Sequence, residues 1–197
     1  MLRPCLGLHP EFAERDEVAA LADLIRKERD NIAAIGEVGL DYWLAKTEPA
    51  RDRQRDILRT FATLSSSLDL PLNVHSRSAG HYTIDLLREA GAKKVLMHAF
   101  DGRASYALRG VEAGFLFSIP PSIARSPQKQ KLVQRLPLEA LCLETDAPVL
   151  GPVKGERNEP ANARVSAEYI SALKGIPLET VLHTTYENAV RLFGSSK

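Results

Sequence analysis

Short apolar runs recur along the chain, and turn residues bound them. Each run is apolar throughout and does not alternate between apolar and polar positions. This pattern is typical of strands that are buried on both faces of a parallel sheet. The sequence therefore predicts six short strands, over 2–8, 32–35, 70–74, 94–97, 115–119 and 141–143.

The segments between these runs have apolar residues at helical spacing. In the first of them, for example, Val18, Leu21 and Ile25 fall on one face of a helix. The order of strand and then helix, repeated six times, predicts an α/β fold with right-handed βαβ units, either doubly wound or closed as a barrel. The predicted helices cover 11–29, 51–68, 83–90, 104–113, 128–136, 163–174 and 178–193.

Composition and charge indicate which class of protein the chain belongs to. The 197 residues include 26 Lys and Arg against 25 Asp and Glu, and 44% are hydrophobic, so we predict one globular domain over 1–197. Without a basic surplus, an anionic substrate must be held by a local site. The chain has neither an apolar run of membrane-spanning length nor a signal-peptide pattern. We therefore expect an intracellular protein, cytoplasmic or nuclear, with no membrane contact and no obligate protein partner.

Four of the predicted strands are followed by a side chain that can bind a metal ion: Glu37, His75, His98 and Asp146. Because the carboxyl ends of parallel strands meet at one edge, we expect these residues to converge. A single residue of this kind is more often a helix cap or a hydrogen-bonded core residue. Four such residues at the ends of four strands favour a metal site. Two imidazoles and two carboxylates suit Zn²⁺, Mn²⁺, Fe²⁺ or Co²⁺, and they suit Mg²⁺ less well.

Two glycines and an arginine accompany this set. Gly36 and Gly39 lie on either side of Glu37, which indicates a backbone held close to a neighbour. Arg77 follows His75 by two residues, so we expect its guanidinium to project into the same mouth and to bind a phosphate at two points.

Other polar residues allow more than one interpretation. Arg157 and Asn158 follow the last predicted strand, where they could also bind a phosphate. Tyr42 and Trp43 could stack on a base, or they could cover the helix that follows. The arginines within 51–59 and the run 128–131 indicate solvated helix faces in preference to a nucleic-acid patch.

Six short motifs carry a resemblance to a known family. They are GLHP at 7–10, GEVGLD at 36–41, HSR at 75–77, HAFDG at 98–102, ETDAP at 144–148 and RNEP at 157–160. In order and spacing they resemble the signature segments of the TatD-type metal-dependent deoxyribonucleases, along the whole chain. The resemblance implies a TIM-type (β/α)8 barrel of the metal-dependent hydrolase superfamily, with 3'-exonuclease-like hydrolysis of phosphodiesters and DNA as the substrate.

The resemblance also implies roles for individual residues. Glu37 would bridge two divalent metal ions, His75 and His98 would complete the shell of one, and Asp146 would belong to the other. Glu37 and Asp146 would be the catalytic residues. The identity of the metal, among Zn, Mn, Fe, Co and Mg, is left open. The positions that match the lining of the substrate mouth are His9, Arg77 and Asn158.

One family motif has no counterpart in this sequence. The family's first strand ends in His-x-His, which supplies two metal ligands, and a complete barrel takes about 250 residues. We therefore expect a barrel that is N-terminally shortened to about six βα units and that retains close to one metal ion. Two alternatives stay open: an amidohydrolase-like hydrolase of small esters or amides, and a catalytically impaired short isoform with a binding role.

Overall fold

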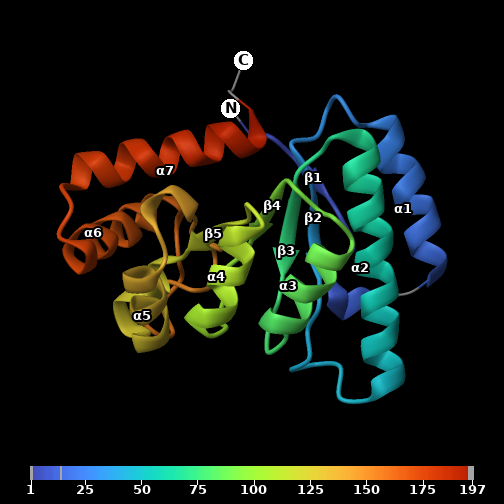
Figure 1. The fold of residues 1–197 in the computed structure, drawn as a ribbon, viewed down its shortest axis with the longest axis horizontal. Coiled ribbons are helices and arrows are strands. Elements are labelled where there is room, and N and C mark those ends of the chain that lie inside the picture. The colour runs from blue at the N-terminus through green and yellow to red at the C-terminus, as the bar shows by residue number, and fades with distance from the viewer. Residues whose placement is uncertain (1, 14, 195–197) are drawn as a thin grey trace.

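The strands form one parallel sheet in the computed structural model, which describes residues 2–13 and 15–194 (Figure 1). Their order across the sheet is their order in the sequence, and every neighbouring pair is parallel. The strands are β1 (Cys5–Leu6), β2 (Ala34–Gly39), β3 (Leu72–His75), β4 (Val95–Met97), β5 (Leu116–Ile119) and β6 (Leu141–Leu143).

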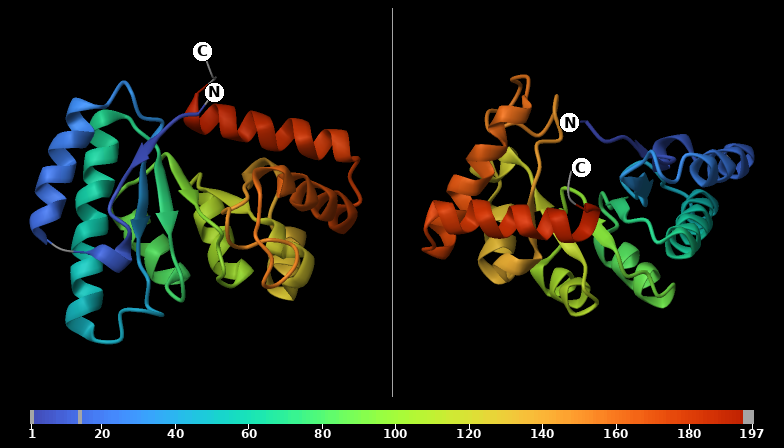
Figure 2. Two further views of the ribbon diagram at one scale, coloured as in Figure 1. Left: turned by 180° about the vertical axis from the view of Figure 1, so that it is seen from behind. Right: turned by 90° about the horizontal axis from the view of Figure 1, so that it is seen from above.

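This strand order decides between the two predicted arrangements. A doubly wound sheet reverses its strand order at a switch point, whereas a barrel adds each strand beside the previous one. The sequential order is that of a barrel, and the helices lie in an arc around the strands (Figure 2). The predicted α/β fold of the TIM-barrel type is therefore confirmed, with six strands.

The helices follow the strands in alternation. They are α1 (Arg15–Lys27), α2 (Glu48–Leu68), α3 (Gly80–Glu89), α4 (Ala104–Glu112), α5 (Pro127–Arg135), α6 (Ala163–Lys174) and α7 (Leu178–Phe193), with short 3-10 helices at Pro10–Phe12, Pro121–Arg125, Leu138–Ala140 and Pro160–Asn162. The last two long helices have the bounds that the sequence predicts. Helix α2 begins earlier than predicted, because the Thr47 side chain accepts a hydrogen bond from the backbone N–H of Ala50 and caps it there.

The largest differences from the predicted elements lie near the amino terminus. The predicted strand over 2–8 is reduced to Cys5–Leu6, and the predicted helix over 11–29 is divided into a 3-10 turn and α1. Strand β2 lies further along the chain than predicted, so Glu37 is inside the strand and does not follow it. The register explains this: Ile35 pairs with Leu72 and Val38 with Val74, so two residues of β2 oppose one residue of β3 in a bulge.

Apolar side chains from the strands and helices fill one continuous core. Its largest fully buried members include Phe61, Phe100, Phe115 and Phe117. Burial of these rings fixes the strands and therefore the residues at their carboxyl ends.

Helix α7 covers the end of the sheet opposite the carboxyl ends of the strands. There its Leu192 packs on Leu96, Leu116 and Cys142. The Arg3 guanidinium donates to the carbonyl oxygen of Phe193 at 2.7 Å, which places the amino-terminal segment beside the end of α7 (Figure 1). In the described part of the chain, no helix combines the length and the apolar character that a membrane crossing requires.

Candidate metal centre

The four residues singled out at the predicted strand ends converge on one point. Oε1 of Glu37 lies 3.3 Å from Nδ1 of His75 and 3.5 Å from Nε2 of His98. Nε2 of His98 lies in turn 3.3 Å from Oδ1 of Asp146. Three of them come from the ends of β3, β4 and β6, and Glu37 comes from the bulge of β2. The convergence that parallel strands predict is therefore present.

Two glycines allow β2 to approach β3 closely enough to place Glu37. A Cβ atom on Gly36 would lie 2.6 Å from Cβ of Asn73, and one on Gly39 would lie 2.0 Å from the carbonyl oxygen of His75. Gly39 also has a φ of +153°, which side chains disfavour. The prediction of a backbone held close to a neighbour is confirmed at both positions.

Each imidazole is held by a second carboxylate on its other ring nitrogen. Oδ2 of Asp41 lies 3.0 Å from Nε2 of His75, and Oε2 of Glu144 lies 2.6 Å from Nδ1 of His98. A carboxylate on one ring nitrogen holds the proton there and leaves the lone pair of the other nitrogen free. The free atoms are then Nδ1 of His75 and Nε2 of His98, and both face Glu37.

The carboxylate of Glu144 is fixed by the neighbouring strand. The hydroxyl of Ser118 donates to Oε2 of Glu144 at 2.5 Å, and the backbone N–H of Ala99 donates to that hydroxyl at 3.3 Å. The positions of Asp41, Glu144 and Ser118 in the sequence predict no role for them at a metal site. One signal for Glu144 was available, since it precedes Asp146 by two residues and extended chains place such residues on one side.

The carboxylates of the cluster favour the protonated form of its two imidazoles. Burial acts to lower the pKa of His98, but hydrogen bonds to Asp146 and Glu144 and the charge of Glu37 raise that pKa to about 11. Burial also acts to lower the pKa of His75, but the hydrogen bonds and charges of Glu37 and Asp41 raise that pKa above its usual value. Burial acts to raise the pKa of Glu37, but the two histidines lower it. A divalent cation can take the place of these protons among the carboxylates.

The cluster lines a cavity of about 600 Å³, and His9 forms part of its wall. The ring centroids of His9 and His75 lie 4.6 Å apart with an interplanar angle of 70°. Nδ1 of His9 accepts a hydrogen bond from the backbone N–H of Glu11 at 3.3 Å. One ligand atom each from His9, Glu37 and His75 lie within 4.8 Å of one another.

Arg77 lies at the same cavity, as predicted for its position after His75. Its guanidinium carbon lies 3.9 Å from the centroid of the half-exposed Trp43 ring, a cation–π contact. Tyr42 is buried, and its hydroxyl accepts a hydrogen bond from Arg55 of α2 at 2.8 Å. Tyr42 therefore covers the following helix, which was the second of its two interpretations, and Trp43 supports Arg77.

Lys129 is also in the cavity wall, although the sequence indicated a solvated helix face. That prediction is wrong for this residue, because only 8% of Lys129 is exposed. Its ammonium group donates to the carbonyl oxygens of Ala99 at 2.8 Å and Phe100 at 3.4 Å, and burial lowers its pKa. Lys129 therefore fixes the segment that directly follows His98.

Asn158 was expected to line the substrate mouth, but it is buried beside the cavity. Its side chain is 2% exposed, and its amide nitrogen donates to the carbonyl oxygens of Thr145 at 2.6 Å and Val149 at 2.7 Å. Its amide oxygen accepts from the backbone N–H of Glu159 and from the Asn162 side chain. The amide is thus fully occupied in bracing the loop that carries Asp146, and it does not line the cavity.

Comparisons with known proteins identify the family of this chain. The family model for TatD-related DNases matches residues 1–194. The chain is 53% identical to a human protein named deoxyribonuclease TATDN3 over 201 residues, which is 96% of this chain and 73% of that protein. It is 34% identical over 197 residues to the Bacillus subtilis protein YabD, named a metal-dependent hydrolase, covering 95% of this chain and 76% of YabD.

Solved structures give the same result. The crystal structure of YjjV, a TatD homologue from Escherichia coli, superposes with a TM-score of 0.88 at 28% sequence identity, covering 99% of this chain and 78% of that one. A TatD-family hydrolase from Entamoeba histolytica superposes with a TM-score of 0.83 at 24% identity, covering 98% and 75% of the two chains, and shares the fold. From its motifs, its fold and its relatives, the chain belongs to the TatD-related DNase family of metal-dependent hydrolases.

Proposed function

We propose that this protein is a metal-dependent deoxyribonuclease that hydrolyses phosphodiester bonds at the cluster around Glu37. The observation that carries the proposal is the position of Oε1 of Glu37 between Nδ1 of His75 and Nε2 of His98, with Oδ1 of Asp146 against the same Nε2 of His98. An intracellular location, and DNA as the substrate in preference to a small ester or amide, remain predictions.

The proposed ligands are Glu37, His75, His98 and Asp146. Their chemistry fits a divalent cation because each imidazole has a carboxylate on its outer nitrogen, which is the usual support for a metal-bound histidine. A bound divalent ion would supply positive charge that lowers the pKa of a water molecule and neutralises charge on a phosphate. The mixed N and O donors favour Zn²⁺, Mn²⁺, Fe²⁺ or Co²⁺ over Mg²⁺.

The proposed catalytic residues, Glu37 and Asp146, differ in what they can do with a proton. Glu37 is in contact with both histidines, so its charge serves to hold the ligand set together. Asp146 contacts His98 through Oδ1 and has a 30% exposed side chain in the cavity wall. A carboxylate in that position can orient the attacking water and accept its proton.

His9 is proposed to bind substrate through a donor. Because Nδ1 of His9 accepts the backbone N–H of Glu11, the proton of the neutral ring is on Nε2. Nε2–H is then a donor for a phosphate oxygen and is a poor metal ligand. Arg77 is proposed to bind another phosphate oxygen, with its guanidinium held in place by Trp43.

Asn158 is proposed to act on the site through Asp146 instead of through substrate. Its hydrogen bonds to the carbonyls of Thr145 and Val149 close the loop on both sides of Asp146. This proposal differs from the direct substrate contact that the resemblance implies.

The test is cleavage of a labelled single-stranded oligonucleotide by protein that is first depleted of metal and then reloaded with Mn²⁺ or Zn²⁺. We expect cleavage only after reloading, and a loss of at least 100-fold in the variant His98→Asn. The matched control is His183→Asn, which changes an exposed histidine on α7 and should leave the rate unchanged. Cleavage of p-nitrophenyl esters without cleavage of DNA would instead support the amidohydrolase-like alternative, and no cleavage of either would support the binding role.

A further inference from the structure

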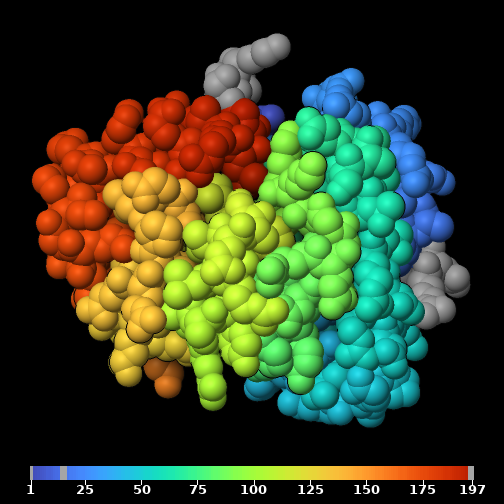
Figure 3. Space-filling model, in the orientation of Figure 1, coloured from blue at the N-terminus to red at the C-terminus, as the bar shows by residue number. Residues whose placement is uncertain are grey.

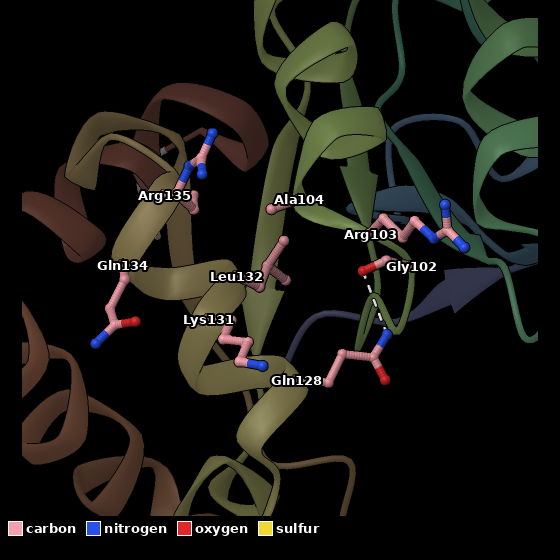
Figure 4. A pocket seen from close by; sticks show the side chains of 8 residues that line it. All are labelled: Gly102, Arg103, Ala104, Gln128, Lys131, Leu132, Gln134 and Arg135. Carbon is pink, nitrogen blue, oxygen red and sulfur yellow. Dashed lines mark hydrogen bonds between the residues drawn. The ribbon is translucent and has the colours of Figure 1, made fainter.

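A second cavity lies next to the proposed active site, in a groove between α4 and α5. It has a volume of about 590 Å³. Leu132 and Ala104 form its floor, and Arg103, Gln128, Lys131 and Arg135 are spread along its edges (Figure 4). Helices α4 and α5 lie beside each other on one exposed face of the molecule (Figure 3). The groove is therefore open to a ligand from solvent.

The charge of the groove is positive. The stretch 113–138, which includes α5, contains Arg125, Lys129, Lys131 and Arg135 and no Asp or Glu. No acidic residue is among those that line the groove. In a chain with a net charge of +1, this is a local excess of positive charge.

The three cations of the groove also lack acidic partners. Several exposed arginines of this protein are paired, for example Arg26 with Asp23 and Arg29 with Asp30. Arg103, Lys131 and Arg135 form no ion pair with any described residue. Their charges are available to an anion.

The groove adjoins the proposed active site. Asp101 and Lys129 line the active-site cavity, and their neighbours in the chain, Gly102 and Gln128, line the groove. The Gln128 side-chain amide donates to the carbonyl oxygen of Gly102 at 3.3 Å (Figure 4), so this pair forms the ridge between the two cavities. A chain-like substrate held in the active site can cross the ridge into the groove.

The arrangement of the cations indicates which kind of anion fits. Arg103, Lys131 and Arg135 all line the groove, but in Figure 4 they extend in different directions, Arg103 on the side away from α5, and do not converge on one point. A single small anion requires convergent donors, whereas a series of phosphates can use donors that are spread out. The apolar floor gives room for sugars or bases between the phosphates.

We propose that the groove between α4 and α5 binds successive backbone phosphates of a single nucleic-acid strand whose scissile phosphate lies in the cluster around Glu37. The inference rests on the proposed function and specifies it further: the substrate is a polynucleotide several residues long, and not a mononucleotide or a dinucleotide. Gln128 and Lys131 are exposed, as their helical pattern predicts, and in this proposal they belong to a binding surface.

The test measures binding without catalysis. A fluorescent 12-nucleotide single strand is titrated with the metal-free protein at a series of salt concentrations. The variant is Arg103→Gln with Lys131→Gln and Arg135→Gln. The matched control is Lys27→Gln with Arg88→Gln and Lys93→Gln, which removes the same charge from exposed positions outside the groove. Because all six side chains are exposed, both proteins should keep the parent's melting temperature.

Each lost phosphate contact should make the slope of log K against log salt less negative by about 0.7. We expect the groove variant to change this slope by about 2 and to weaken binding at least 10-fold at low salt, with the control close to the parent. An unchanged slope, or an equal change in the control, overturns the proposal. Equal displacement of the strand by polyglutamate of the same charge also overturns it, in favour of an acidic peptide.

A second measurement separates this proposal from the proposed function. With metal present, the groove variant should lose cleavage of the 12-nucleotide strand and keep cleavage of a dinucleotide. Equal loss on both substrates overturns a role for the groove in strand binding. If the parent binds the strand through the groove but cleaves neither substrate, strand binding by the groove stands, and the proposed function fails together with the placement of a scissile phosphate at Glu37.

Discussion

Replacing Glu144 by glutamine should weaken metal binding although Glu144 is not a proposed ligand. Its Oε2 lies 2.6 Å from Nδ1 of His98 and also accepts from Ser118, and its side chain is only 12% exposed, so solvent screens little of its charge. Glutamine keeps the shape and removes the charge. Loss of such an outer partner costs about 10-fold to 100-fold in metal affinity, which is about 1.4 to 2.8 kcal/mol.

Competition by protons does not cancel this effect. In the metal-free protein, Glu144 helps to raise the pKa of His98, so the variant also binds that proton less tightly. Exchange of a proton for a divalent cation adds one positive charge near Glu144, however, and a carboxylate favours the state with the higher charge. The net change at pH 7 therefore remains a loss of metal affinity.

The assay is a chelator competition titration with Zn²⁺ or Mn²⁺, at pH 7 and at pH 8. The matched control is Glu139→Gln, which removes the same charge from an exposed residue of a 3-10 helix. Metal affinity of the Glu144 variant within a factor of two of the parent would refute the reasoning that the outer carboxylate orients His98.

Three further predictions follow from neighbouring contacts. Lys129→Met should leave the carbonyls of Ala99 and Phe100 without their donor and lower the free energy of unfolding by about 1–3 kcal/mol in a denaturant titration, whereas an unchanged midpoint would contradict this contact. His9→Asn should raise KM for the oligonucleotide with the metal content unchanged, and loss of metal would show that His9 is a ligand. In the metal-free protein, the raised pKa of His98 stabilises the fold fully below pH about 6.5, and this contribution, on the order of a few kcal/mol, is lost as pH rises through about 11. Urea titrations from pH 7 to pH 11 should therefore show falling stability with a flatter profile in His98→Asn, and equal profiles would contradict the assignment.

The fold was largely predictable because the strands are apolar throughout. Strand β6 and helices α6 and α7 have the predicted bounds, because an apolar run marks the strand and apolar residues at helical spacing, with a glycine directly after each, mark the helices. Strand β2 was placed too early because its last four residues include Gly36, Glu37 and Gly39, and a bulge cannot be inferred from hydrophobicity.

The site was predictable only where strand ends supply its residues. Topology brings Glu37 and His98 together, and the sequence order of the strands is sufficient to expect this. The positions of Lys129 and Asn158 depend on how α5 and the loop after β6 pack, which no local pattern encodes. Both residues therefore differ from their expected surroundings.

The most direct test of the central claim is a crystal soaked with Zn²⁺ and measured at the zinc absorption edge. We predict anomalous density within about 2.1 Å of Nδ1 of His75 and Nε2 of His98, in contact with the carboxylates of Glu37 and Asp146, and its loss in crystals of His98→Asn. Anomalous density elsewhere in the molecule, with these four side chains in contact only with one another, would contradict the account.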